Sequence, residues 1–194
     1  MSHSEFIGVV MSGGKSQRMG TNKALLERHG KTMADFTAEC LTTAGARQVL
    51  YSVPFGFETV ASNQIADITS SLGPLGGILS ILDYAINQDI KTNFLFVPVD
   101  LPLLKPQTLT QLAQYSLINE NAVTFHRQPL PVLIRPSLDI LKTLIEITDT
   151  QKNLSMFHFL DKINAEAIKL EDVDVLYNSN RPEEWQAALA KLKS

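Results

Sequence analysis

Residues 6–26 have the sequence FIGVVMSGGKSQRMGTNKALL, which joins a short apolar run to a glycine-rich, cationic segment. The run at 6–11 is typical of a buried β-strand. In the segment that follows, Gly13 and Gly14 allow the main chain to approach an anion and to turn its N–H groups toward it. Arg18 and Lys23 add positive charge where a polyphosphate would lie. The stretch therefore predicts a strand that ends in a phosphate-binding loop.

Spacing separates this loop from two common phosphate-binding motifs. Gly14-Lys15-Ser16 matches the end of a Walker A motif, but that motif requires a glycine where the chain has Val9. The dinucleotide fingerprint G-x-G-x-x-G is also absent. What remains is the pattern G-G-x-S-x-R-M-G-x-x-K. The simpler alternative, an ordinary strand-to-helix turn with solvated cations, leaves the spacing of this long pattern to chance.

Length and composition predict a single domain, residues 1–194. Hydrophobic residues make up 44% of the chain and charged residues 19%, which is ordinary for a globular protein. A net charge of −3 argues against nucleic-acid binding. No apolar run has the length of a membrane span, and the basic segment of a signal peptide is absent. Because the single cysteine, Cys40, cannot form an internal disulfide, we expect a cytoplasmic protein.

The order of apolar runs and helical patterns predicts an α/β fold. Strands are predicted at 6–11, 48–53, 64–68, 94–99, 122–125, 131–134 and 167–170, and helices at 32–44, 78–87, 106–117, 137–147 and 154–163, with another helix starting at Pro182. Strand and helix alternate through residue 120, which favours a mostly parallel sheet flanked by helices. The mixed last third of the chain allows one antiparallel strand.

Asp100 is the candidate metal ligand. It follows the most apolar run of the chain, 94–99, and so lies at the carboxyl end of a predicted strand. Ligands bind at this edge in open α/β sheets. A helix-capping role is the alternative, but the next predicted helix begins only at Pro106. One carboxylate together with phosphate oxygens is a common way to hold Mg²⁺.

Together these residues predict phosphate chemistry without a covalent enzyme intermediate. The sequence has no nucleophile elbow and no evident Ser-His-Asp or Cys-His set. An acceptor that is a phosphate monoester needs no general base at neutral pH, because its second pKa is about 6. The predicted reaction is attack of that acceptor on the α-phosphorus of a nucleoside triphosphate, with release of pyrophosphate. Alignment and charge neutralisation would lower the barrier.

The pattern at 11–23 resembles the signature L-A-G-G-x-S-x-R-M-G-x-D-K of the molybdenum cofactor guanylyltransferases, which are sugar-nucleotide-type nucleotidyltransferases. Further matches at 73–77, 98–102 and 178–184 extend the resemblance over nearly the whole chain. The chain departs from the pattern at Met11-Ser12, where Leu-Ala is usual, and at Asn22, where Asp is usual. The resemblance implies a Rossmann-like nucleotidyltransferase fold, GTP and the molybdenum-bound pterin cofactor as substrates, and Mg²⁺ as the metal.

The resemblance also implies roles for individual residues. Arg18 would stabilise the leaving pyrophosphate, Lys23 would contact the transferring phosphoryl group, and Asp100 would hold the Mg²⁺. Nucleotide-binding positions would be Met11, Ser12, Gly13, Gly14, Lys23, Ser52, Asp67, Gly73, Pro74, Leu75 and Asp100. Asn178 and Asn180 would face the pterin, and Asn180 would also be placed to assist the metal.

The choice of substrates leaves alternatives open. Relatives that use CTP tend to have alanine in place of Gly13, and glycine leaves room for a larger purine. The tripeptide Gly73-Pro74-Leu75 also follows the guanine-using pattern. The alternatives are a cytidylyltransferase for the same cofactor, a transferase for another sugar or polyol phosphate, and a catalytically weak partner that delivers the cofactor to molybdoenzymes. Transient contacts with cofactor-supplying or molybdoenzyme-maturation proteins would accompany these functions.

Overall fold

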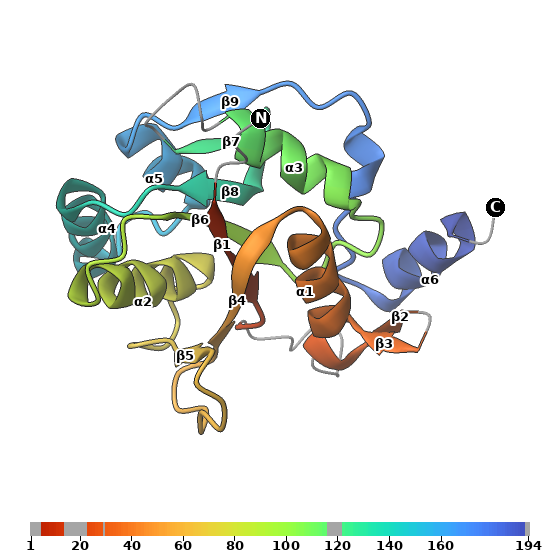
Figure 1. Ribbon diagram of the computed structural model, residues 1–194, viewed down its shortest axis with the longest axis horizontal. Helices are drawn as coiled ribbons and strands as arrows, with labels where there is room; N and C mark the ends of the chain where they lie inside the picture. Colours follow the sequence, from red (N-terminus) through yellow and green to blue (C-terminus); the bar gives the residue numbers. More distant parts are fainter. Residues whose placement is uncertain (1–4, 14–22, 29, 116–121, 193–194) are drawn as a thin grey trace.

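The computed structural model of the protein describes residues 5–13, 23–28, 30–115 and 122–192. Within these residues a seven-stranded sheet has the order β5-β4-β1-β6-β8-β7-β9 (Figure 1). Its strands are β1 (Phe6–Met11), β4 (Ala46–Val53), β5 (Gln64–Ala66), β6 (Asn93–Pro98), β7 (Val123–Phe125), β8 (Gln128–Ile134) and β9 (Glu166–Ile168). A small hairpin of β2 (Glu27–Arg28) and β3 (Lys31–Thr32) stands apart from this sheet.

The sheet is mostly parallel, as the sequence predicts. Strands β5, β4, β1 and β6 pair in parallel, and β7 pairs in parallel with β9. Strand β8 runs antiparallel to both of its neighbours, β6 and β7. The expectation of an α/β fold with one antiparallel strand is therefore confirmed.

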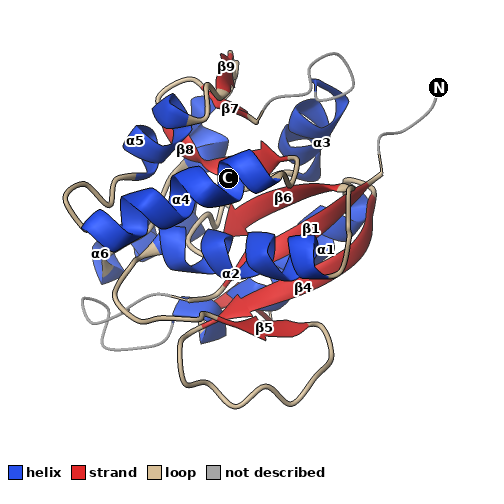
Figure 2. Ribbon diagram, turned by 90° about the vertical axis from the view of Figure 1, so that its left-hand side faces the viewer, coloured by secondary structure: helices blue, strands red, loops and turns tan. Residues whose placement is uncertain are grey.

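Helices cover both faces of the sheet. They are α1 (Met33–Thr43), α2 (Pro74–Asn87), α3 (Pro106–Tyr115), α4 (Leu138–Thr150), α5 (Met156–Lys162) and α6 (Pro182–Lys191). Helices α1 and α3 pack on one face, and α2, α4 and α5 pack on the other. Figure 2 shows α2 and α4 side by side across their face of the sheet. Two hydrophobic clusters, one in each layer, therefore enclose the central strands.

The central strand β1 shows why the sheet is buried on both sides. Phe6 and Val10 point into the cluster under α1 and α3, whereas Ile7 and Val9 point into the cluster under α2 and α4. Side chains alternate along a strand, so only a continuous apolar run can fill both layers. Each such side chain contributes about 1.5–3 kcal/mol on burial. Gly8 allows α1 to approach closely, because a Cβ there would lie 2.9 Å from the Leu41 methyl carbons.

Helix starts follow capping rules that the sequence carries. The Thr32 hydroxyl accepts a hydrogen bond from the Asp35 N–H at the start of α1, at 3.1 Å. The Ser137 hydroxyl accepts one from the Ile140 N–H at the start of α4, at 3.2 Å. Proline occupies the first turn of α2, where a missing N–H costs no helical bond. These local signals explain why α1 and α4 start within one residue of their predicted positions, whereas α2 starts at Pro74, four residues before the predicted start at 78.

The largest departure from the predicted elements lies at 126–134. The sequence predicts a loop at 126–130 and a strand at 131–134, whereas β8 already begins at Gln128, after a tight turn. Arg127 lies in that turn with φ +61°. The hairpin β2–β3 was not predicted, because strands of two residues carry no readable alternation. The other predicted strands and helices are present with shifted ends.

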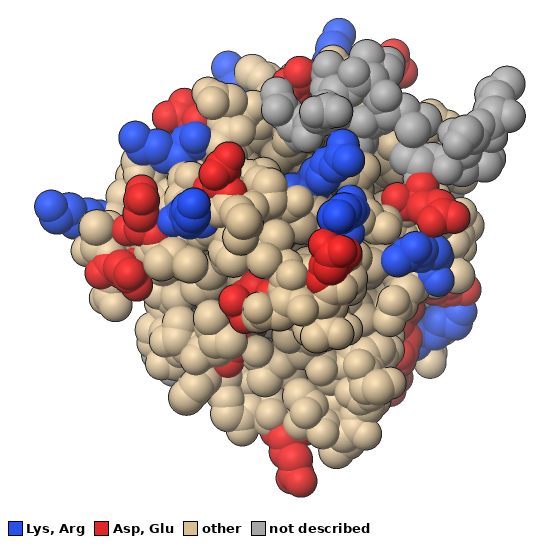
Figure 3. All heavy atoms as spheres, turned by 60° about the vertical axis from the view of Figure 1, so that its left-hand side comes forward, with Lys and Arg blue, Asp and Glu red and all other residues tan. Residues whose placement is uncertain are grey.

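Two further features concern surface charge and helix length. Among the described residues on the face shown in Figure 3, acidic and basic side chains are interspersed. No described helix is both long enough and apolar enough to cross a membrane.

Candidate functional site

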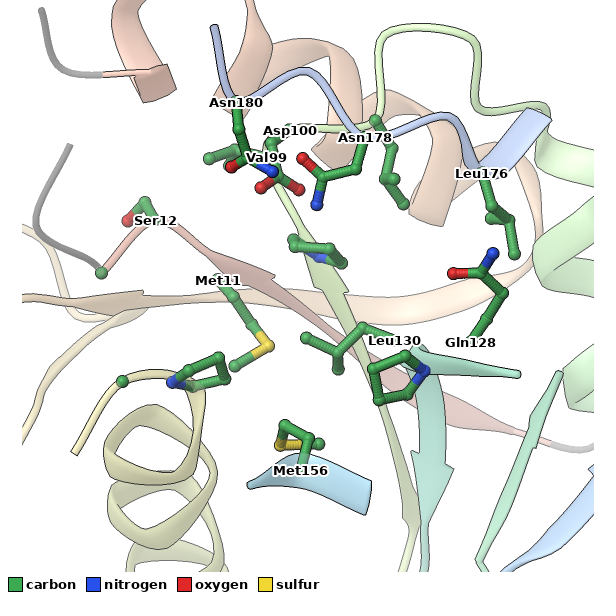
Figure 4. Close-up of a pocket in the computed structure, with 16 residues that line it drawn as sticks. Met11, Ser12, Val99, Asp100, Gln128, Leu130, Met156, Leu176, Asn178 and Asn180 are labelled. Carbon is green, nitrogen blue, oxygen red and sulfur yellow. The ribbon is translucent and has the colours of Figure 1, made fainter. Parts of the chain in front are cut away.

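A pocket of about 390 Å³ opens at the carboxyl ends of β1 and β6 (Figure 4). These strands are neighbours, yet the chain continues from β1 to β4 on one side of the pair and from β6 to β7 on the other side. Ligands bind in open α/β sheets at the point where connections diverge in this way. The pocket is lined by Met11, Ser12, Gly13, Gly73, Pro74, Pro98, Val99, Asp100, Leu101, Gln128, Pro129, Leu130, Met156, Leu176, Asn178 and Asn180.

The pocket has two unlike walls. The first, here called the glycine wall, consists of residues 11–13 and 73–74. The second, the side-chain wall, consists of residues 128–130, Met156 and Leu176. Asp100, Asn178 and Asn180 lie between the two walls at one edge of the pocket.

Asp100 lies where the sequence predicts it, just beyond the end of β6. Its carbonyl oxygen accepts a hydrogen bond from the Ser179 N–H, at 2.9 Å. Ser179 is only 1% exposed, so its side chain points inward. Figure 4 shows the amides of Asn178 and Asn180 beside the carboxylate of Asp100. Anchoring Ser179 therefore brings both of its neighbours into the pocket next to this carboxylate.

The first turn of α6 holds the other end of this segment. The Glu184 carboxylate accepts hydrogen bonds from the N–H groups of Asn180, at 2.6 Å, and Arg181, at 3.0 Å. A glutamate that accepts from main-chain groups before the helix is a capping interaction. Glu184 therefore has the helix-starting role that its place after Pro182 suggests, and it fixes the main chain of Asn180.

The glycine wall is built from main chain and from the start of a helix. Ser12 donates from its N–H and its hydroxyl to the carbonyl oxygen of Ser52, at 3.0 and 2.8 Å, which ties the end of β1 to β4. Gly73 has φ +57° and leads directly into α2. That conformation favours glycine. The N-terminus of α2 carries the positive end of the helix dipole, which favours an anion nearby.

Ser52 and Asp67 form a compact cluster beside Gly13. The Ser52 hydroxyl donates to Asp67 Oδ1 at 3.1 Å. A Cβ on Gly13 would lie 3.3 Å from Asp67 Oδ2, and a Cβ on Gly77 would lie 2.5 Å from Ser52 Oγ. Burial raises the pKa of the Asp67 carboxyl, and the hydrogen bond from Ser52 opposes that rise. The cluster therefore places a partly desolvated carboxylate next to the glycine wall, where only small residues fit.

Not every predicted site residue reaches the pocket. Leu75 is fully buried in the core under α2, so its side chain does not line the pocket. Arg18 and Gly14 lie outside the described residues. Lys23 begins the 3-10 helix Lys23–Leu25, but its side chain is also outside the described part. The phosphate-binding roles of Arg18, Gly14 and Lys23 stay predictions.

The side-chain wall was not predicted as part of the site. Met156 is the first residue of α5, and Leu176 ends the 3-10 helix Val173–Leu176. Gln128 and Leu130 come from the first half of β8. Figure 4 shows Gln128 approaching Leu176, on the side of the pocket away from Ser12. The dipeptide Pro129-Leu130, just before the predicted strand at 131–134, is at most a weak local signal of a site, and Met156 and Leu176 carry none.

The donor atoms at the edge of the pocket suit a hard cation. Asp100 offers a carboxylate, and Asn178 and Asn180 offer amide oxygens. Mg²⁺ prefers oxygen donors and uses one or two carboxylates together with substrate phosphates. Among the described residues there is no group of three or more His, Cys, Asp or Glu side chains that would form an all-protein metal cage. The residues present therefore fit a magnesium ion that is held jointly with phosphate.

Comparison with known proteins agrees with this geometry. The family model "MobA-like NTP transferase domain" matches residues 8–163. The chain is 32% identical over 181 residues to a molybdenum cofactor guanylyltransferase from Xanthomonas euvesicatoria, covering 92% of this chain and 91% of that protein. It is 27% identical to a probable molybdenum cofactor guanylyltransferase from Geobacillus, over 92% of this chain and 95% of that one.

Solved structures show the same fold at low sequence identity. Molybdopterin-guanine dinucleotide biosynthesis protein A from Archaeoglobus fulgidus superposes with a TM-score of 0.76 at 17% identity, covering 96% of this chain and 98% of that chain. The 2-C-methyl-D-erythritol 4-phosphate cytidylyltransferase from Thermus thermophilus superposes with a TM-score of 0.68 at 12% identity, with the same coverage. Because the family model spans most of the chain and a relative is 32% identical over nearly its whole length, the protein belongs to the MobA-like NTP transferase family and is a nucleotidyltransferase.

Proposed function

We propose that the protein transfers GMP from GTP to the terminal phosphate of the molybdenum–pterin cofactor, with release of pyrophosphate. The observation that carries the proposal is the position of Asp100 and the two asparagines between unlike walls of one pocket. The glycine wall suits a nucleotide, and the side-chain wall suits a second, largely uncharged ring system. The names of the relatives from Xanthomonas and Geobacillus support the same pair of substrates.

The proposed reaction forms one P–O bond and breaks another. A terminal phosphate oxygen of the acceptor attacks the α-phosphorus of GTP, and the bond from that phosphorus to the α,β-bridging oxygen breaks. Pyrophosphate leaves with the electron pair of that bond. The acceptor phosphate is largely ionised at neutral pH, so no residue has to remove a proton. The protein's task is to align two anions that repel each other.

The chain's residues divide this task between the two walls. Main-chain N–H groups at the end of β1 and at the start of α2 would bind the nucleotide phosphates. Arg18 and Lys23 would neutralise charge on the leaving pyrophosphate and on the transferring group. Asp100, with Asn178 and Asn180 beside it, would hold Mg²⁺ and orient the acceptor phosphate. When bound, Mg²⁺ supplies positive charge to the phosphate oxygens.

The cluster of Ser52 and Asp67 supports GTP over CTP. A carboxylate accepts hydrogen bonds through two oxygens, so Asp67 suits guanine, whose N1–H and 2-amino group are adjacent donors on one edge, better than cytosine, whose only N–H donor is its 4-amino group. Gly13 lines the pocket and Asp67 lies directly behind it, so a methyl group at position 13 would crowd the carboxylate. These two contacts are the specific reason for naming GTP as the nucleotide.

The test is calorimetric titration with GTP, CTP, ATP and UTP, with and without Mg²⁺, followed by a cofactor-transfer assay that measures pyrophosphate. We expect Mg²⁺-assisted binding of GTP and pyrophosphate release only when the cofactor is present. Preference for CTP would move the function to the cytidylyltransferase alternative. Failure to bind any nucleotide would favour a cofactor-delivery role. The variant Asp100→Asn should retain the fold and lose the transfer, which would assign the measured activity to this pocket.

A further inference from the structure

Arg28 links the small hairpin β2–β3 to the loop that carries Asp100. Its Nε–H donates to the carbonyl oxygen of Pro102 at 2.8 Å, across 74 residues of sequence. Its guanidinium carbon lies 4.0 Å from the centre of the Phe36 ring on α1. The guanidinium group therefore contacts the hairpin's own helix and the Asp100 loop at the same time. Figure 1 shows the hairpin beside the start of α1.

The acceptor of this hydrogen bond is close to the centre of the site. Pro102 is buried and follows Asp100 by two residues. The Ser179 N–H also holds this loop, because it donates to the Asp100 carbonyl. Leu101 and Leu104 of the loop are buried in the hydrophobic cluster that also contains residues of α1. Arg28 adds a short side-chain hydrogen bond that reaches this loop from the N-terminal third of the chain.

The environment of Arg28 is that of a structural contact rather than a solvated surface charge. Burial lowers the pKa of its guanidinium group, which remains charged at any ordinary pH. Desolvating a charge is unfavourable unless good partners replace water. The Pro102 carbonyl and the Phe36 ring are such partners, because a guanidinium both donates in its plane and stacks on aromatic faces.

The hairpin is also continuous with the proposed phosphate-binding segment. The 3-10 helix Lys23–Leu25 ends two residues before Glu27, and the Met33 N–H donates to the Leu26 carbonyl at 2.8 Å. Fixing Arg28 on Pro102 therefore fixes the main chain of Lys23 relative to Asp100. Misplacing catalytic groups by about 1 Å can cost about a hundredfold in rate.

We propose that Arg28 is a positioning residue, which sets the place of the Asp100 loop relative to the end of the phosphate-binding segment at Lys23. The proposal rests on the proposed function, since it assigns Lys23 and Asp100 to one reaction. Arg28 itself does not line the pocket. Its effect should therefore fall on turnover more than on binding of GTP.

Cys40 provides an independent reporter for this loop. It is the only cysteine of the chain, lies on α1 and is 3% exposed. Its Sγ lies 4.0 Å from the carbonyl oxygen of Leu104, on the same loop as Asp100. Burial raises the pKa of the thiol to about 11. Modification of Cys40 by a maleimide therefore requires the loop and helix to separate, and its rate measures that separation without any substrate.

The experiment compares Arg28→Met, Arg28→Lys and Lys31→Met with the wild-type protein. Lys31 is the matched control, because it lies on the same hairpin and pairs with Glu39 of the same helix at 2.7 Å, away from the Asp100 loop. For Arg28→Met we expect kcat to fall about tenfold, with KM for GTP changed less than about twofold. Cys40 modification should be several-fold faster. Arg28→Lys should be intermediate, and Lys31→Met should match wild type.

Three results would overturn the proposal: an unchanged kcat in Arg28→Met, an equal loss in Lys31→Met, or an unchanged rate of Cys40 modification. If Arg28→Met does not fold, Arg28→Lys carries the same comparison, because it keeps the charge and loses the planar donor. If the wild-type protein makes no guanylylated cofactor, the proposed function fails. The modification rates still decide whether Arg28 holds the loop.

Discussion

The glycine wall and the side-chain wall face each other across one pocket, but they are specified in different ways. The glycine wall is made largely of main chain, and glycine is favoured there because a Cβ on Gly13 would crowd Asp67 and because Gly73 has a positive φ. The side-chain wall is made of Gln128, Leu130, Met156 and Leu176, which come from three separate elements. A main-chain site leaves a motif in the sequence, whereas a wall of side chains from distant elements does not.

Asp100 belongs to neither wall, so its removal should have the largest effect. In Asp100→Asn the side chain keeps its shape and loses its charge, and we expect turnover to fall by about a thousandfold, or ~4 kcal/mol of transition-state stabilisation. Steady-state release of pyrophosphate measures the loss, and circular dichroism checks the fold. Retention of full activity with Mg²⁺ would show that Asp100 takes no part in the reaction. The two walls would then have no catalytic residue between them.

A methyl group added to the glycine wall should have the next largest effect. In Gly13→Ala the new Cβ would lie 3.3 Å from Asp67 Oδ2, which is tighter than an ordinary contact. We expect the affinity for GTP to fall about tenfold, or ~1.4 kcal/mol, and the affinity for CTP to fall less. Calorimetric titration with both nucleotides in the same variant supplies its own control. Equal losses would show that the wall does not select the base.

The same contrast explains what the sequence could predict. Strands β1 and β6 are buried on both faces, so their sequences are continuous apolar runs that predict strands. The position of Asp100 at the carboxyl end of a strand could then be predicted from the end of β6. The glycine-rich motif likewise predicts that the chain belongs to a nucleotidyltransferase family, and the family match confirms this prediction.

The parts that could not be predicted depend on long-range packing. Met156 begins a helix of seven residues, and nothing local distinguishes it from a core methionine. Gln128 reaches the pocket because β8 pairs antiparallel between β6 and β7, an arrangement that no local pattern encodes. Leu75 shows the converse case, since its motif position predicts nucleotide contact while its side chain is buried in the core.

A substitution on the side-chain wall should have a smaller effect, confined to the second substrate. Gln128 carries an amide that can both donate to and accept from a heterocycle. In Gln128→Leu we expect KM for the cofactor to rise about fivefold, which corresponds to one hydrogen bond of ~1 kcal/mol. The affinity for GTP should not change. The matched control is Gln107→Leu, an exposed glutamine of α3 outside this pocket. A loss of GTP affinity in Gln128→Leu would contradict the division of the pocket into two walls.

The smallest expected effect separates stability from binding at Asp67. Burial raises the pKa of this carboxyl in the folded state, so the folded protein holds the proton to a higher pH than the unfolded chain does. Below the unfolded pKa, near 4, the two states bind the proton alike. As pH rises from there through the folded pKa, the unfolded chain ionises first and the wild-type protein loses stability. Asp67→Asn has no such loss.

Measured against wild type, Asp67→Asn should therefore gain stability between pH 4 and pH 7. The gain should be a few degrees in Tm at most, since ~1 kcal/mol corresponds to about 2–4 °C for a chain of this size. Its affinity for GTP should fall over the same range, because asparagine presents an amide in place of a carboxylate. Thermal melts and titrations at both pH values test the two directions together. A parallel loss of stability and affinity would make Asp67 a structural residue of the segment between β5 and α2, and would leave no group beside the glycine wall to recognise the base.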